Sequence, residues 1–147
     1  MPAFDGVRTT YTTPGLRFPV LRATDDQGVT YLATAVVNVL SVNQIDGLLR
    51  AKWNGMKAAL KGGALDVALG FFALNQQARY SAIFAAVLGN LPQIAADMEE
   101  IELVQVRGRT AQYRIGRTQE WGGQSVRVAY YIFFVLGVDG VWRIWDF

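Results

Sequence analysis

The spacing of hydrophobic residues changes twice along this chain of 147 residues. Up to about residue 42, and again from Ile101 to the end, hydrophobic and polar residues alternate with a period of two, which predicts β-strands. Between these regions the hydrophobic residues recur every three or four positions, which predicts amphipathic helices. The pattern therefore predicts a β segment, then a set of helices, then a second set of strands.

The most hydrophobic stretch of the chain runs from Ser125 to Phe147. It predicts a long strand up to Leu136, a turn that contains Asp139 and Gly140, and a closing strand from Val141. One face of the long strand carries Val126, Val128, Tyr130, Ile132 and Phe134, and the other carries Ala129, Tyr131, Phe133 and Val135. Because both faces are hydrophobic, both need a cover, and we expect a second copy of the chain or another partner on one of them.

The N-terminal region is rich in Thr and Val and contains two turn signals, Pro14-Gly15 and the run from Asp25 to Gly28. Such turns divide the region into strands near Val7–Thr12, Leu16–Ala23 and Thr30–Leu40. We therefore predict a three-stranded antiparallel β segment within residues 1–42.

The middle of the chain predicts three helices. The first is expected to be capped by Asn43 and to end at Gly62-Gly63, with a stripe formed by Ile45, Leu48, Leu49, Trp53, Met56 and Leu60. A short helix follows from Ala64 to about Phe72. The third carries Tyr80, Ile83, Phe84, Val87, Leu88 and Leu91 on one face and is broken or restarted at Pro92, with a helical turn or two up to Glu100.

Strands are predicted again at Ile101–Val106 and Thr110–Arg117, followed by a loop from Thr118 to Gln124. Together with the terminal hairpin they predict a four-stranded antiparallel meander. The predicted core contains Leu49, Trp53, Met56, Leu69, Phe84, Leu88, Tyr113, Tyr130, Ile132 and Ile144.

Composition excludes several kinds of chemistry. The chain has no Cys and no His, so it lacks disulfides, thiolate nucleophiles and the commonest metal ligands and general base. We expect no metal site, no cofactor and no catalytic residue. The formal charge is only +2 and the arginines are scattered, so nucleic-acid binding is not expected. No apolar stretch reaches about 18 residues, the length needed to span a membrane. The start of the chain, Met1–Asp5, does not resemble a signal peptide.

The N-terminal region resembles the last three strands of a polycystic kidney disease (PKD) or similar immunoglobulin-like domain. The resemblance covers about 38 residues: the turn from Tyr11 to Gly15, the hairpin from Phe18 to Gly28, and the strand from Val36 to Val39. The first half of such a domain, including its Phe-Gly-Asp-Gly motif, is missing, and Phe4-Asp5-Gly6 is at most a remnant of it. An alternative is a β-meander that adds to the main sheet.

Residues 43–147 resemble the nuclear transport factor 2-like (cystatin-like) α+β cone. The resemblance is carried by the order of the elements, by the segment from Trp53 to Leu60 with the Gly-rich step after it, and by the closing run from Asp139 to Ile144. It implies a curved antiparallel sheet wrapped on three helices, a pocket inside the cone, and an outer sheet face that often dimerises. We thus expect two domains, 1–42 and 43–147.

The two resemblances together imply a non-catalytic module of a larger exported or surface-associated bacterial protein, joined to other domains of a longer chain. Such a module would bind a small apolar ligand or a protein, and it would form a homo-oligomer, either through its sheet face or by exchange of N-terminal strands. The aromatic residues expected to line the pocket are Trp53, Phe84, Tyr113 and Tyr130, although aromatic residues at this spacing also serve as ordinary core.

Two alternatives stay open. One is an enzyme that resembles the ketosteroid isomerases or the polyketide cyclases and uses Asp and Tyr in the pocket, for which Asp46, Asp66, Asp97 and Tyr80 are the candidates. Asp46 and Asp66 are also explained as carboxylates at helix starts. The other is an adaptor that binds protein partners through exposed Trp121 and Trp145.

Overall fold

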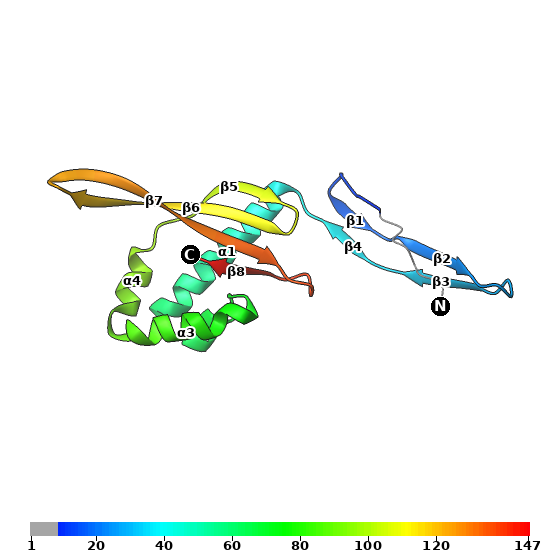
Figure 1. The fold of residues 1–147 in the computed structure, drawn as a ribbon, viewed down its shortest axis with the longest axis horizontal. Coiled ribbons are helices and arrows are strands. Elements are labelled where there is room, and N and C mark those ends of the chain that lie inside the picture. Colours follow the sequence, from blue (N-terminus) through cyan, green and yellow to red (C-terminus); the bar gives the residue numbers. More distant parts are fainter. Residues whose placement is uncertain (1–8) are drawn as a thin grey trace. The chain divides into compact units, whose positions relative to one another are not determined.

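The computed structural model describes residues 9–147, which form two compact units that meet in the sequence between Ile45 and Asp46. Figure 1 shows the helices and the antiparallel strand pairs of these units. The predicted α+β class is confirmed, because four α-helices and several antiparallel strand pairs are present in the described residues.

The first unit is an antiparallel ribbon of four short strands, β1 (Gly15–Arg17), β2 (Val20–Thr24), β3 (Thr30–Thr34) and β4 (Val37–Val39). β1 pairs with β4 and β2 pairs with β3, so the strands are successive parts of one long hairpin. We call residues Gly15–Val39 the N-terminal arm. Its ladder is interrupted at Pro19, which has no N–H to donate and whose carbonyl accepts from the Ala35 N–H at 3.1 Å.

The arm corrects the predicted three-stranded segment. The predicted strands Leu16–Ala23 and Thr30–Leu40 each split in two, at Phe18-Pro19 and at Ala35-Val36. Of the predicted strand Val7–Thr12, Thr9–Thr12 are not a strand. Val7 and the Phe4-Asp5-Gly6 motif lie outside the described residues.

The arm has no core of its own. No side chain from residue 9 to residue 48 is buried, and large apolar side chains such as Phe18 (66% exposed) and Leu32 (68% exposed) face solvent. What fixes the arm is its backbone ladder and its turn, where the Asp25 carboxylate accepts the Gln27 and Val29 N–H groups at 3.0 and 2.8 Å. An isolated two-stranded ribbon is only marginally stable in water, so the backbone ladder and the turn stabilise the arm weakly.

Helix α1 (Val42–Lys61) is capped by Ser41 rather than by Asn43 as the sequence predicted. The Gln44 N–H donates to the Ser41 hydroxyl at 3.2 Å, and the Gln44 side chain accepts the Ser41 N–H at 2.8 Å. This reciprocal pair is a capping box, which satisfies two backbone N–H groups at the helix start. One face of α1 is buried and consists of Leu49, Trp53, Met56 and Leu60.

Three further α-helices follow, where the sequence predicted two: α2 (Leu65–Leu69), α3 (Gln77–Ala86) and α4 (Leu91–Asp97). Two short 3₁₀ turns, Leu74–Gln76 and Leu88–Asn90, precede α3 and α4. Pro92 lies in the first turn of α4, where a missing N–H costs nothing, so it starts a helix. Because α3 ends at Ala86, the expected stripe is broken, and Leu88 is 54% exposed instead of belonging to the core.

The second unit contains a four-stranded antiparallel meander in the order β5-β6-β7-β8, as predicted. Its strands are β5 (Glu102–Arg107), β6 (Thr110–Trp121), β7 (Gln124–Leu136) and β8 (Trp142–Asp146). The predicted loop Thr118–Gln124 is wrong, because β6 and β7 stay paired to Trp121 and Gln124. Gly122 and Gly123 alone make the turn, with positive φ angles of 59° and 78° that glycine adopts without strain.

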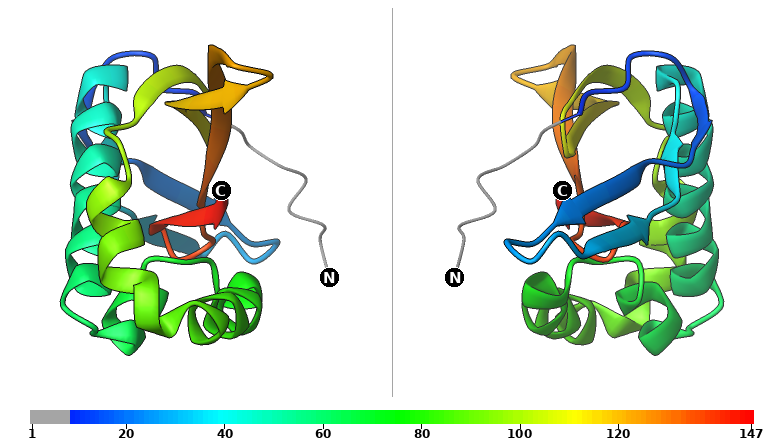
Figure 2. Two further views of the ribbon diagram at one scale, coloured as in Figure 1. Left: turned by 90° about the vertical axis from the view of Figure 1, so that its left-hand side faces the viewer. Right: turned by 90° about the vertical axis from the view of Figure 1, so that its right-hand side faces the viewer.

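The core of the second unit lies between the helices and one face of the meander. Figure 2 shows α1 and α4 beside the sheet in two views. From the predicted core, Leu69 is only half-buried and Tyr130 is 42% exposed, and the other members apart from Leu88 are buried: Leu49, Trp53, Met56, Phe84, Tyr113, Ile132 and Ile144. Across residues 9–147, no helix has both the length and the apolar character that crossing a membrane requires.

Candidate ligand-binding cavity

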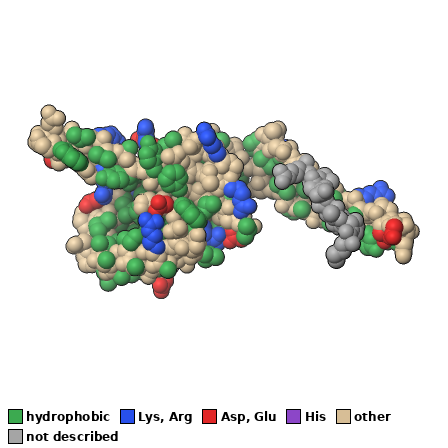
Figure 3. Space-filling model, viewed as in Figure 1, with side chains coloured by type: hydrophobic (Ala, Val, Ile, Leu, Met, Phe, Trp, Pro, Cys, Tyr) green, Lys and Arg blue, Asp and Glu red, His purple; other side chains and the backbone are tan. Residues whose placement is uncertain are grey.

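A cavity of about 250 Å³ lies in the second unit between α1, α4 and the helix-facing side of β6 and β7. Its lining is mostly apolar and aromatic: Trp53, Ile94, Met98, Ile115, Arg117, Tyr130, Tyr131, Ile132 and Phe147. Figure 3 shows hydrophobic side chains gathered in a hollow between the β6–β7 ribbon and the helices. Apolar walls with a few polar groups are typical of small-molecule sites.

Trp53 forms the α1 side of the cavity and is fully buried. Its indole Nε1 donates to the carbonyl of Glu99 at 3.0 Å, so its one polar atom is already satisfied. Its ring meets the ring of Phe147 edge to face, with centroids 5.3 Å apart. The two rings form a fixed aromatic wall.

Phe147 is held in place by Tyr80 of α3. The Tyr80 hydroxyl accepts the Phe147 N–H at 2.9 Å and donates to the Asp146 carboxylate at 2.9 Å, and the rings of Tyr80 and Phe147 stack at 5.3 Å. Burial raises the pKa of Tyr80, and the Asp146 carboxylate contributes to the rise, so the hydroxyl stays protonated. Tyr80 therefore positions a cavity wall.

Arg117 of β6 and Tyr130 of β7 bring polar groups to the cavity. Both are on the helix-facing side of their strands, in line with Ile115 and Ile132. The Tyr130 hydroxyl accepts a hydrogen bond from Gln119 Nε2 at 2.6 Å. Arg117 carries the one charge among the side chains that line the cavity.

The structure brings together two of the four aromatic residues expected in the pocket, Trp53 and Tyr130. Phe84 packs with Phe72 and Tyr80, at ring-centroid distances of 5.8 and 5.9 Å, in a cluster that reaches the cavity only through Phe147. Tyr113 packs edge to face on Phe134. Neither Phe84 nor Tyr113 lines the cavity.

Sequence reasoning missed the seven other residues that line the cavity: Ile94, Met98, Ile115, Arg117, Tyr131, Ile132 and Phe147. The predicted strand Thr110–Arg117 did place Ile115 on the same face as Tyr113, and the same alternation also reaches Arg117, its last residue. No sequence pattern places Met98 or Phe147, because each follows the end of its element and is positioned only by packing.

Asp46 belongs to a polar network beside the core. Its carboxylate accepts the Tyr113 hydroxyl at 3.0 Å and Arg50 Nε at 3.0 Å, while Arg50 also donates to the carbonyl of Ile101. Burial raises the pKa of Tyr113 well above its ordinary value, and the neighbouring Asp46 carboxylate adds to the rise. Asp46 is the fifth residue of α1, beyond the first turn, so the explanation of it as a carboxylate at the helix start is wrong.

The other acidic residues considered for catalysis lie elsewhere. Asp66 is exposed in the first turn of α2, and Asp97 is exposed and accepts a hydrogen bond from Gln93 at 2.8 Å. Neither they nor Asp46 line the cavity. Any chemistry in the cavity would have to use tyrosine hydroxyls and Arg117.

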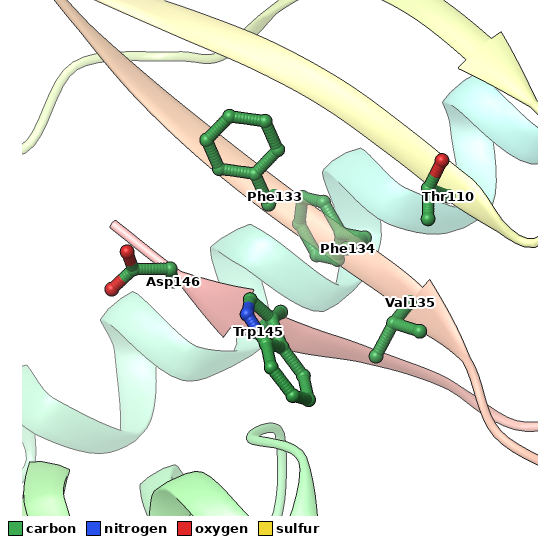
Figure 4. A pocket seen from close by; sticks show the side chains of 6 residues that line it. All are labelled: Thr110, Phe133, Phe134, Val135, Trp145 and Asp146. Atoms are coloured by element: carbon green, nitrogen blue, oxygen red, sulfur yellow. The ribbon is translucent and has the colours of Figure 1, made fainter.

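The outer face of the sheet carries a second apolar site. Phe133, Val135 and Trp145 border a depression of about 530 Å³ over β7 and β8, together with Thr110, Phe134 and Asp146 (Figure 4). Trp145 and Phe133 are partly exposed there. Trp121, at the tip of the β6–β7 hairpin, is 77% exposed.

In the described part of the chain, no three acidic side chains cluster as metal ligands would, and the sequence has no His or Cys to add. The chain matches no protein-family model, no curated protein and no solved structure.

Proposed function

We propose that this chain is a non-catalytic binding module, in which an α+β unit similar to the nuclear transport factor 2-like cone holds a small apolar ligand. The observation that carries the proposal is the cavity of about 250 Å³ between Trp53, Met98 and Phe147. Its walls are fixed before any ligand arrives, because Trp53 is bonded to the Glu99 carbonyl and Phe147 to Tyr80. A prearranged apolar site loses little ordering entropy when it binds.

The size of the cavity limits its occupant. It lies below the range of about 300–1,000 Å³ that is usual for drug-sized ligands. The module would accordingly take a compound of one aromatic ring rather than a steroid-sized one.

Calorimetric titration with a small neutral aromatic compound, 3-phenylpropanamide, tests this function. Ile94→Phe should abolish binding because it places a ring in the cavity, whereas Ile83→Phe should not, since Ile83 lies on α3, is exposed and does not line the cavity. Binding that is unchanged in Ile94→Phe would count against a ligand-binding function of this cavity, as would a parent protein that binds neither this amide nor the corresponding carboxylate.

The module would belong to a larger exported or surface-associated protein, as the two sequence resemblances imply. In support, the apolar side chains of the arm are exposed on a two-stranded ribbon, as expected for part of a sandwich whose second sheet covers it. Limited proteolysis of the chain with and without the neighbouring domains of such a longer protein would test this. Protection of the arm only in the longer chain is the expected result.

We also propose that the module self-associates through the outer sheet face, on which Phe133, Val135 and Trp145 are gathered. Apolar patches on a sheet face commonly mark interfaces. Phe133→Arg should shift sedimentation towards the monomer, and Leu88→Arg, an exposed position on a 3₁₀ turn, should not. An oligomer unaffected by Phe133→Arg would exclude this face.

The enzymatic alternative would use Asp46 with Tyr113 or Tyr80. The bond of Asp46 to both Arg50 and Tyr113 favours a structural role, because its carboxylate is already engaged. Asp46→Asn should leave any activity of the parent protein intact. Loss of an activity in a folded Asp46→Asn variant would favour the enzyme.

A further inference from the structure

The cavity combines an apolar body with a single positive charge. Of the nine side chains that line it, only that of Arg117 is charged, and none is acidic. Within residues 9–147, Arg117 takes part in none of the five ion pairs and in none of the side-chain hydrogen bonds. By contrast, Arg114, on the opposite face of β6, is paired with Glu102 at 2.9 Å. A guanidinium next to apolar walls attracts an anion more strongly than one in open water.

Tyr130 supplies a second group for an anion. Its hydroxyl oxygen already accepts the hydrogen bond from Gln119 Nε2, so its own proton stays available to donate. Arg117 and Tyr130 come from the two strands of one hairpin, and Arg117 pairs in register with Val128, two residues from Tyr130. Both donors thus face the cavity from neighbouring strands.

The opposite wall suits an aromatic ring. Trp53 has its Nε1 satisfied by Glu99, and it meets Phe147 edge to face, so both present carbon surface to the cavity. Met98, which is nearly buried, adds a thioether that packs well on aromatic rings. With about 250 Å³ available, one ring and a short acidic side chain are the size that fits.

We propose that the ligand of this cavity is a small aromatic carboxylate, with its ring beside Trp53, Met98 and Phe147 and its carboxylate on Arg117 and the Tyr130 hydroxyl. The planar guanidinium matches the two oxygens of a carboxylate, which a neutral ligand cannot exploit. This inference rests on the proposed function, because it specifies the ligand of the same cavity.

The test compares 3-phenylpropanoate with its neutral isostere 3-phenylpropanamide in calorimetric titrations of the full chain. We expect the carboxylate to bind at least about tenfold more tightly, the scale of a charged hydrogen bond. Arg117→Gln should reduce carboxylate affinity to that of the amide and leave amide affinity unchanged. The matched control Arg127→Gln should alter neither, since Arg127 is on the same hairpin but lines a groove of the outer face with Glu102 and Arg114.

The outcomes separate the inference from the function on which it rests. Equal affinity for acid and amide, or an equal loss of carboxylate binding in the Arg117 and Arg127 variants, would overturn the carboxylate assignment and keep the binding function. If neither compound binds, the proposed function fails as well. If the urea midpoint shows that Arg117→Gln folds poorly, the comparison of acid and amide on the parent protein still tests the carboxylate assignment. In that comparison, only the carboxylate should lose affinity as the salt concentration is raised.

Discussion

The N-terminal arm and the β6–β7 hairpin are both antiparallel ribbons with alternating apolar residues, yet they differ in what those residues do. On β7, Ile132 and Phe134 are buried against the helices, whereas on β2 and β3 every large apolar side chain is exposed. A strand buries a face only when a second layer lies on it. Alternation therefore predicts a strand, while burial depends on what the rest of the fold provides.

The same comparison applies within the second unit. The helix-facing side of the sheet makes the core and the cavity, while the outer side leaves Phe133, Val135 and Trp145 around an open depression. Two apolar faces of one strand thus have different roles. The first stabilises the fold, and the second is left partly exposed to solvent.

The largest expected effect contrasts two phenylalanines, one from each unit. Phe84→Ala should lower the free energy of unfolding by about 3–5 kcal/mol, because it empties a site packed by Phe72 and Tyr80. Phe18→Ala, on the exposed arm, should change it by less than about 0.5 kcal/mol. Urea denaturation of both variants measures this, and similar losses would mean that the arm is part of the same core.

The next effect concerns Tyr113 and Asp46. Tyr113→Phe should cost about 1–3 kcal/mol at neutral pH, because the Asp46 carboxylate loses a donor in a partly buried place. Phe134→Leu, at the ring that Tyr113 contacts, is a control that alters packing but keeps the hydrogen bond.

Tyr113 also predicts a pH dependence. Its pKa is raised in the folded protein, so its stabilising contribution is fully present below the unfolded value of about 10 and is lost as the pH rises above it. The parent protein should therefore lose stability between pH 9 and pH 11, and Tyr113→Phe should lose less over the same interval. Equal losses would mean that Tyr113 ionises as freely when folded as when unfolded.

A smaller effect is expected where the helix begins. Ser41→Ala should cost about 1 kcal/mol, because it removes the acceptor for the Gln44 N–H in the capping box. Ser81→Ala, at an exposed position within α3, should cost far less. Hydrogen exchange of the Gln44 amide should become faster only in the Ser41 variant; an unchanged rate would show that the cap contributes little.

The smallest effect on stability, but the clearest on assembly, is expected from deleting residues 1–40. The free energy of unfolding of the second unit should change by less than about 0.5 kcal/mol, because no residue of the arm is buried. Sedimentation at micromolar concentration should show an oligomer before deletion. An oligomer that survives deletion uses the sheet face, one that dissociates uses the arm, and a monomer throughout would contradict self-association.

The sequence by itself determined most elements of the second unit. The 3.6-residue period of Leu49, Trp53, Met56 and Leu60 fixes the buried face of α1, and the period of two along β7 separates Ile132 from Phe133. These are local properties, set by how a helix or strand presents successive side chains. The order of the meander also followed, because consecutive antiparallel strands pair through short turns.

Only the tertiary structure decided where these faces meet. Trp53 and Tyr130 line one cavity, while Phe84 and Tyr113 do not. In the sequence, all four stand on the apolar face of a predicted helix or strand. The position of Phe147 depends on the hydroxyl of Tyr80, 67 residues away, and the bond between Asp46 and Tyr113 spans the same separation. Contacts over such distances result from the packing of whole elements, which local periodicity does not encode.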